Sequence, residues 1–134
     1  MKSLLAFAFA LLLLPVAALA DASADASAAA KAWLALIDKG DFATSWTESS
    51  GLMQARVSQA DWTKAAQPIH EQLGAVVSRA PAGVDMVTAL PGAPDGQYAI
   101  VRFATKFEKK ADAKETVTMM LDGGKWKSAG YFIQ

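Results

Sequence analysis

The spacing of apolar residues changes at the stretch Leu90–Tyr98, which contains two prolines and two glycines. Before this stretch, apolar residues recur mostly at the i, i+3 and i+4 spacing typical of helices, and after it they alternate with polar residues as in strands. Pro91 and Pro94 are excluded from a central strand, and Asp95-Gly96 is typical of a tight turn. We therefore predict a stiff connector between two strands or, alternatively, a preorganised rim for a binding pocket.

Three helical segments are predicted in the N-terminal part of the chain, over residues 26–39, 42–49 and 52–56. An Ala-, Ser- and Asp-rich lead-in begins at Asp21 and is expected to be frayed until it joins the first helix. That helix has an apolar stripe at helical spacing, and a glycine follows its end. Asp41 is a natural N-cap for the second helix, because its side chain can accept from the first free backbone amides.

A fourth helix is predicted over residues 58–73, with Ser58 as its N-cap. Pro68 lies inside this segment and lacks a backbone donor, so we expect a kink or an early stop just before it. The apolar positions of the segment share one helical face, which we expect to be buried. This face consists of Trp62, Ala65, Ala66, Ile69 and Leu73.

The second half of the chain predicts four strands. Pro81-Ala82-Gly83 is expected to form a bulge or bend in the first strand. The mixed-charge stretch 106–112 is expected to be a solvated hairpin loop. The predicted fold is α+β, with N-terminal helices packed on a curved four-stranded antiparallel meander, and Trp33, Trp46 and Trp62 covering its hollow face. The predicted strands span residues 76–79 continuing as 84–89, then 97–107, 114–121 and 125–133.

The first twenty residues have the pattern of a secretory signal peptide. Lys2 supplies a positive charge, an apolar run covers residues 4–14, and Ala18-Leu19-Ala20 fits a signal-peptidase site. The apolar run is too short for a comfortable membrane span, and a polar residue, Asp21, follows at once. We therefore expect residues 1–20 to be removed, and residues 21–134 to form a single exported domain, periplasmic or secreted, with no stable membrane insertion.

Composition argues against several classes of partner. Removal of the leader takes away one of 13 basic residues and none of the 13 acidic residues, which leaves a net charge of −1. Such a balance gives no electrostatic basis for binding nucleic acid or an anionic membrane. The chain contains no cysteine, so stability in an oxidising compartment has to come from its core alone.

The candidate chemistry is sparse. His70 is the only histidine, which argues against a metal site, and its position near a helix end suggests a structural or surface residue. No nucleotide or phosphate-binding motif is present, so no cofactor is expected. Glu115 shares strand parity with apolar residues and is expected to be buried, where Arg79 would be a suitable ion-pair partner. Asp38 lies near a helix C-terminus, where a carboxylate needs compensation from an indole N–H or from Arg79.

Aromatic residues are numerous for a chain of this size. The tryptophans, together with Tyr98 and Tyr131, are candidates to line a ligand pocket, although aromatic residues at helical spacing more often form a core. In either position, a buried indole N–H or phenol O–H requires a hydrogen-bond partner.

Several motifs resemble a family of small exported bacterial proteins known only as domain of unknown function 4019. The resemblance covers almost all of the chain after the leader and implies no activity, cofactor or substrate. The order of helices followed by a curved sheet is also similar to the cystatin-like and nuclear-transport-factor-like cone folds, a likeness of architecture that implies no function. The motifs are Trp33-Leu34, Ile37–Gly40, Ser45-Trp46, Val57-Ser58, Trp62, Gly74, Ser78-Arg79, Leu90–Tyr98, Phe107–Lys110, Glu115, Trp126 and Gly130-Tyr131.

Three functions are consistent with these features. The sequence favours a non-catalytic module that binds a small apolar ligand or a protein partner. A second possibility is an enzyme that uses Glu115 or Asp38 as a general base inside a cone-shaped cavity, which would require a raised carboxyl pKa. A third is a structural envelope protein whose cavity is filled by its own side chains. An open apolar pocket would favour the first, an unpaired carboxylate in an open polar pocket the second, and a closed aromatic core with Glu115 fully paired the third.

The predicted leader has a direct test. Mass spectrometry of the protein purified from its native cell envelope is expected to show a chain that begins near Asp21, because signal peptidase cuts after small residues at the A-x-A site. A mature chain that still starts at Met1 would contradict the prediction.

Overall fold

The structure is a computed structural model that describes residues 16–134, and the side chains from residue 18 onward. Most of the predicted signal peptide, residues 1–15, therefore lies outside the described residues. The described chain is α+β, as predicted, with four helices followed by four strands in one antiparallel sheet of order β1-β2-β3-β4. The elements are α1 Val16–Asp38, α2 Phe42–Thr47, α3 Gly51–Arg56, α4 Gln59–Leu73, β1 Val76–Val87, β2 Tyr98–Phe107, β3 Lys110–Asp122 and β4 Lys125–Ile133.

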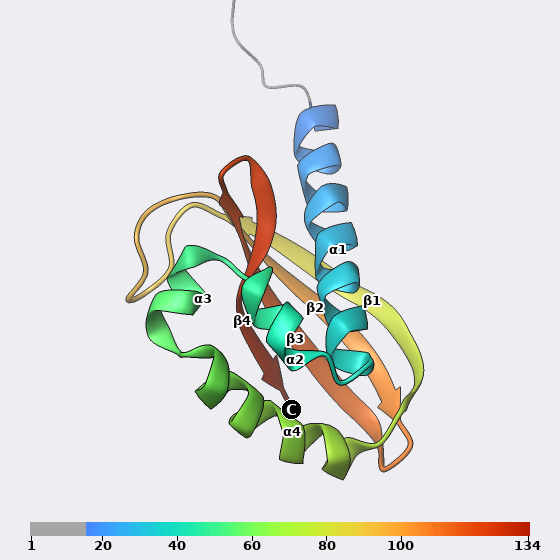
Figure 1. Cartoon of the computed structure of the whole chain (residues 1–134). Coiled ribbons are helices and arrows are strands. Elements are labelled where there is room, and N and C mark those ends of the chain that lie inside the picture. The colour runs from blue at the N-terminus through green and yellow to red at the C-terminus, as the bar shows by residue number, and fades with distance from the viewer. Residues whose placement is uncertain (1–15) are drawn as a thin grey trace, which may run out of the picture.

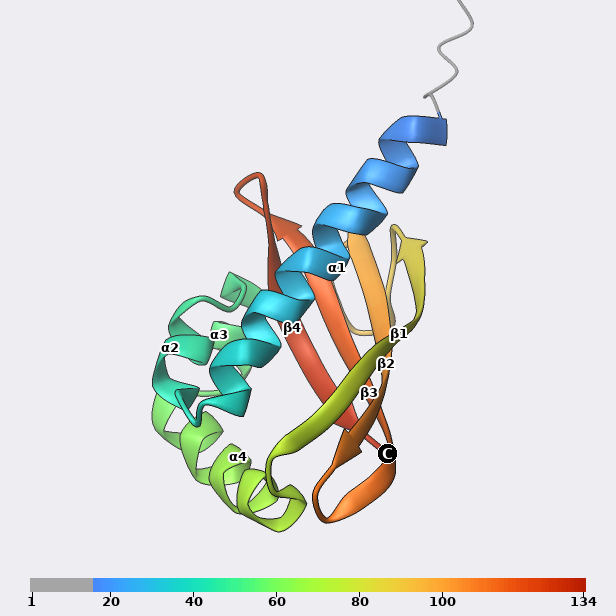
Figure 2. The same ribbon diagram turned by 90° about the vertical axis from the view of Figure 1, so that its right-hand side faces the viewer.

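The helix α1 lies across the sheet and contacts all four strands (Figures 1 and 2). The shorter helices α2 and α3 and the helix α4 are gathered beside its C-terminal half (Figure 1). The apolar stripe of α1 packs on inward-facing residues of β2 and β3, and this contact forms the core. Its members include Ala26, Ala30, Trp33, Leu34 and Ile37 on α1, with Val101, Phe103, Val117 and Met119 from the sheet.

Three hydrogen bonds donated by tryptophan indoles join the helical segments to one another. The indole Nε1 of Trp33 donates to the backbone oxygen of Ser45 at 2.9 Å, and the indole Nε1 of Trp62 donates to the Ser45 hydroxyl at 2.9 Å. Trp46 donates its indole proton to the Val57 carbonyl at 2.8 Å. All three indole donors are thus satisfied, as buried tryptophans require, and α1, α2 and α4 meet at one serine.

Local signals predicted the short elements well. The Asp41 and Ser58 side chains accept from backbone amides three residues later, as N-caps do. The register of β1 against β2 shifts between Pro81 and Gly83, which confirms the predicted bulge. Residues 88–97 connect β1 to β2 outside regular structure, where the Tyr98 hydroxyl donates to the Pro94 carbonyl at 2.5 Å.

Three predicted boundaries were wrong. The lead-in before residue 26 is helical rather than frayed, since α1 begins at Val16, and its many alanines have the highest helix propensity. The helix α4 does not stop before Pro68: both Pro68 and Lys64 are exposed, so water can satisfy the carbonyl that loses its donor. The expected loop over 106–112 is only a two-residue turn at Glu108-Lys109, because charged side chains fit exposed strand positions.

Candidate functional site

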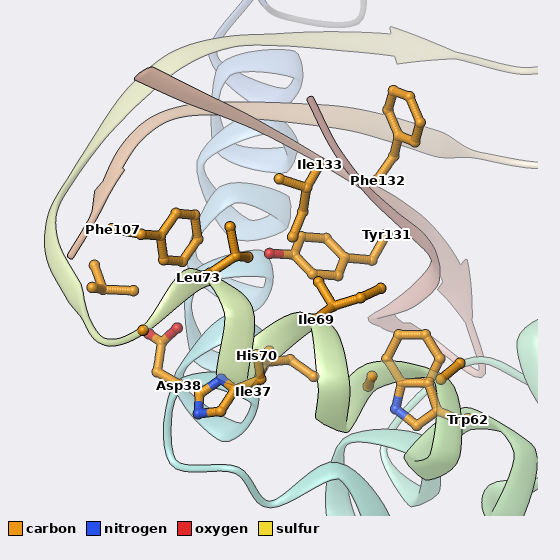
Figure 3. A pocket seen from close by; sticks show the side chains of 14 residues that line it. Ile37, Asp38, Trp62, Ile69, His70, Leu73, Phe107, Tyr131, Phe132 and Ile133 are labelled. Atoms are coloured by element: carbon orange, nitrogen blue, oxygen red, sulfur yellow. The ribbon is translucent and has the colours of Figure 1, made fainter. Parts of the chain in front are cut away.

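A pocket of about 280 Å³ lies between α4 and the end of the sheet, where β1 begins and β2 and β4 end. Its volume is just below the roughly 300–1,000 Å³ of typical small-molecule sites, so a ligand for it would be small. Figure 3 shows Tyr131 and Ile69 between Trp62 on one side and Asp38 on the other. The lining residues are Ile37, Asp38, Trp62, Ala65, Ala66, Ile69, His70, Leu73, Gly74, Val76, Phe107, Tyr131, Phe132 and Ile133.

The wall formed by α4 corrects a prediction. Its apolar face was expected to be buried, yet the helix has no buried residue. All five apolar residues predicted for that face instead line the pocket. The physical reason is that α4 packs mainly on α2 and stands off from the sheet, so that its apolar side faces open space. A helical pattern therefore identified the apolar face correctly but not what lies opposite.

Two large apolar side chains of the lining are strongly exposed. Ile69 on α4 is 50% exposed and Phe132 on β4 is 58% exposed. Large apolar side chains in water carry a free-energy cost that a bound apolar molecule would remove. These residues belong to a pocket whose lining is otherwise mostly aliphatic and aromatic, which is typical of sites for apolar ligands.

An ion-pair network lies directly behind one end of the pocket. The Arg79 guanidinium on β1 donates to Glu115 on β3, with Nε 2.7 Å from Oε1 and an Nη 3.3 Å from Oε2. It also donates two hydrogen bonds, of 2.8 and 3.0 Å, to the carboxylate of Asp38 at the end of α1. The predicted ion pair of Arg79 with Glu115 is present, and the compensation that Asp38 requires comes from Arg79 rather than from an indole.

Glu115 is fully buried, at 0% exposure, and its carboxylate is completely engaged. Besides Arg79, it accepts hydrogen bonds from the hydroxyls of Thr105 on β2 and Tyr131 on β4. Four donors thus surround one carboxylate, which is the arrangement that makes a buried charge tolerable.

Burial and the negative charge of Glu115 together raise the pKa of Tyr131 far above its ordinary value, and the hydrogen bond to Glu115 adds to this effect. Burial alone would lower the pKa of Arg79, but its hydrogen bonds and charge contacts with Asp38 and Glu115 outweigh this and raise it. The guanidinium and the phenol therefore both keep their protons throughout the physiological range.

This network limits what the site can do chemically. A general base needs a free lone pair aimed at its substrate, whereas the Glu115 carboxylate accepts from four protein donors and does not line the pocket. Among residues 16–134, no group of three or more His, Asp or Glu side chains is placed to hold a metal ion.

The residues predicted from the sequence take four kinds of position: in the pocket lining, behind it, in the core, or away from the pocket. Asp38, Trp62 and Tyr131 line the pocket, and Arg79 and Glu115 support it from behind. Trp33 belongs to the core, although its ring lies 5.9 Å from that of Trp62 and 5.5 Å from that of Tyr131. Trp46 and Tyr98 lie outside the lining, and so does the connector Leu90–Gln97, so the idea that it forms the rim of this pocket is wrong.

Other residues of the site were missed. Thr105 shares strand parity with Phe103 and Phe107, so its inward position could have been inferred from the alternation. His70 was expected to be a surface or helix-end residue; it does lie in the last turn of α4, and it is half-buried, lines the pocket and packs against Phe42 with ring centroids 5.5 Å apart. Phe132 was not singled out from the sequence, and it is 58% exposed on β4.

Comparison with known protein families places the chain in a family of unknown function. The family model described as "Protein of unknown function (DUF4019)" matches residues 29–131, so the chain belongs to this family. Among curated proteins, none matches the chain. No helix within residues 16–134 is both long enough and apolar enough to cross a membrane.

The coupling between Arg79 and Glu115 is open to a double-mutant cycle. Arg79→Met is expected to lower the free energy of unfolding by about 3 kcal/mol, because it leaves Glu115 buried without a cation. Glu115→Gln is expected to lower it by about 2 kcal/mol, because it removes a buried charged acceptor while Arg79 keeps its pairing with Asp38. The double variant is expected to lose at least about 1 kcal/mol less than the sum of the two losses, as contacting residues do. Urea unfolding followed by circular dichroism gives all four values.

The exposed pair Arg102 and Asp85 is a matched control, since its N–O distance of 2.7 Å equals that of Arg79 and Glu115. Arg102→Met and Asp85→Asn are expected to show a coupling below about 1 kcal/mol, because water screens the pair. Additive losses for Arg79 and Glu115 would contradict the role given to their network.

Tyr131 predicts a loss of stability at alkaline pH. The unfolded phenol ionises near pH 10, whereas the folded phenol stays protonated, so its contribution is complete below about pH 10 and declines above it. At about pH 11 the wild type should have lost about 1.4 kcal/mol more than Tyr131→Phe, relative to about pH 8. Urea unfolding at both pH values measures this difference, and equal slopes for the two proteins would refute the assignment.

Proposed function

We propose that this protein is an exported, non-catalytic module that binds a small apolar ligand in the pocket between α4 and the sheet. The observation that carries the proposal is the apolar face of α4: its five residues all line an open pocket and none of them is buried, although Trp62 and Ala66 also contact the core. A helix amphipathic enough to be buried, but left facing a cavity, is stabilised by any apolar molecule that fills the space.

The carboxylates favour binding over catalysis. Glu115 is held by Arg79, Thr105 and Tyr131, so its lone pairs stabilise the fold. Asp38 lines the pocket, and each of its oxygens accepts one hydrogen bond from Arg79, so this carboxylate is held as the anionic partner of the guanidinium. The polar groups near the pocket thus act together as a rigid support for an apolar wall, in line with a binding function.

Export is part of the same proposal. Among the described side chains of α1, those from residue 18 to residue 25 include no buried one, and the buried stripe starts at Ala26. Cleavage after Ala20 would therefore remove no core residue. The helix lying across a meander also supports, as an architectural proposal, a likeness to the cystatin-like and nuclear-transport-factor-like cones.

A larger side chain in the pocket is expected to weaken ligand binding without unfolding the protein. Octanol is expected to bind the mature chain and to change the fluorescence of Trp62, which lines the pocket. Ala66→Phe places a ring in the cavity and is expected to weaken octanol binding at least about ten-fold, because the ligand and the ring compete for the same volume. Calorimetric titration and tryptophan fluorescence measure the affinity.

The matched control is Ala60→Phe, on the same helix but exposed and outside the lining. It is expected to bind octanol like the wild type, and Trp62→Phe should remove most of the fluorescence change. Saturable binding that Ala66→Phe leaves intact, or no binding of octanol at all, would overturn the proposed function. In the second case Ile69 and Phe132 would instead mark a contact surface for a protein partner, the alternative ligand of the first function considered from the sequence.

A further inference from the structure

We infer that the ligand of this pocket is an amphipathic amine, with a positively charged nitrogen against Asp38 and an apolar body along α4. This inference rests on the proposed function, since it specifies the chemistry of a ligand for the same pocket. It comes from the charges and hydrogen-bonding capacity of the pocket wall.

Asp38 supplies the only formal charge among the lining aspartate, glutamate, lysine and arginine side chains. Its side chain is 31% exposed, so it remains accessible from the pocket side although it pairs with Arg79. Each carboxylate oxygen accepts one hydrogen bond from the guanidinium and has capacity for another. The pocket end therefore presents an available anionic acceptor.

The Arg79 charge does not neutralise this end of the pocket. One guanidinium serves two carboxylates, Asp38 and Glu115, so the cluster has a net charge of −1. Its donors are directed at those carboxylates, and Arg79 is not among the lining residues. A cation in the pocket would compensate the excess negative charge.

The Tyr131 hydroxyl also favours a ligand that donates hydrogen bonds. Tyr131 uses its proton in the hydrogen bond to Glu115, so its oxygen can offer the pocket only an acceptor. Tyr131 and Phe107 also line the pocket, and a cation is attracted to the electron-rich face of an aromatic ring.

The same wall disfavours the opposite class of amphiphile. A fatty acid of equal length would place its carboxylate beside Asp38, and among the lining residues no lysine or arginine would pair with it. Like charges in contact repel, so this head group is disfavoured. The apolar body of the ligand, by contrast, is recognised in the same way whatever its head, by Ile69, Leu73 and their neighbours.

Three ligands of matched chain length separate the head from the body: octylamine, octanol and octanoate. At about pH 8 the amine is protonated, by analogy with the lysine side chain. Calorimetric titration of the mature wild-type chain is expected to show octylamine binding about ten-fold more tightly than octanol, and octanoate more weakly than octanol.

Asp38→Asn keeps the shape of the side chain and an oxygen for Arg79 but removes the charge. It is expected to bring the octylamine and octanol affinities within about two-fold of each other by weakening the binding of octylamine. Asp95→Asn removes one negative charge from the β1–β2 connector, outside the pocket lining, and is expected to keep the wild-type preference.

A measurement on the wild type covers the case in which Asp38→Asn unfolds. Raising NaCl from roughly 50 to 500 mM is expected to reduce the preference for the amine without weakening octanol binding, because only the charged contact is screened.

The outcomes distinguish the two levels of the proposal. Equal affinities for octylamine and octanol, or tightest binding of octanoate, would overturn the assignment of the head and leave the apolar pocket standing. A preference for octylamine that survives in Asp38→Asn would also overturn this assignment, because a group other than Asp38 would then recognise the ammonium charge. Failure of all three ligands to bind would overturn the proposed function itself.

Discussion

The arrangement of this protein depends on one guanidinium that holds two carboxylates from distant parts of the chain. Arg79 on β1 binds Asp38 at the end of α1 and Glu115 in the middle of the sheet. A fully buried carboxylate such as Glu115 is destabilising by itself, so its position requires Arg79, Thr105 and Tyr131 around it. The same requirement fixes the C-terminal end of α1 on the sheet, and the helices that follow start from that fixed point.

The pocket follows from how α4 is attached. Trp62 is hydrogen-bonded to Ser45 of α2, and α4 packs mainly on α2 rather than on the strands. The short helices therefore act as a spacer, and the apolar side of α4 is held at a distance from β1 and β4. The ion network closes one end of the resulting space and gives it a negative charge, while Ile69 and Phe132 leave exposed apolar surface beside it.

Most of the fold could be predicted from the sequence because its signals are local. N-caps at Asp41 and Ser58, the Pro81–Gly83 bulge and the alternation of β2 each act within a few residues. The inward position of Glu115 followed from strand parity, and parity together with its charge suggested Arg79. The distance between α4 and the sheet could not be predicted, since periodicity shows which side of a helix is apolar but not what occupies the space opposite. The length of α1 was misjudged because serine and aspartate were taken as signs of fraying, although alanine outweighs them.

Asp38, Arg79 and Glu115 lie far apart in the sequence, and this separation sets the order in which the structure can become rigid. Asp38 pairs with a residue 41 positions later, and that residue is in turn held by one a further 36 positions along. The helix that leaves the ribosome first is thus locked in place only after most of the polypeptide has been synthesised. For a chain exported as proposed, the late formation of these ion pairs would keep the N-terminal half flexible while the chain crosses the membrane through a translocation channel. The compact state would form once β3 had been translocated.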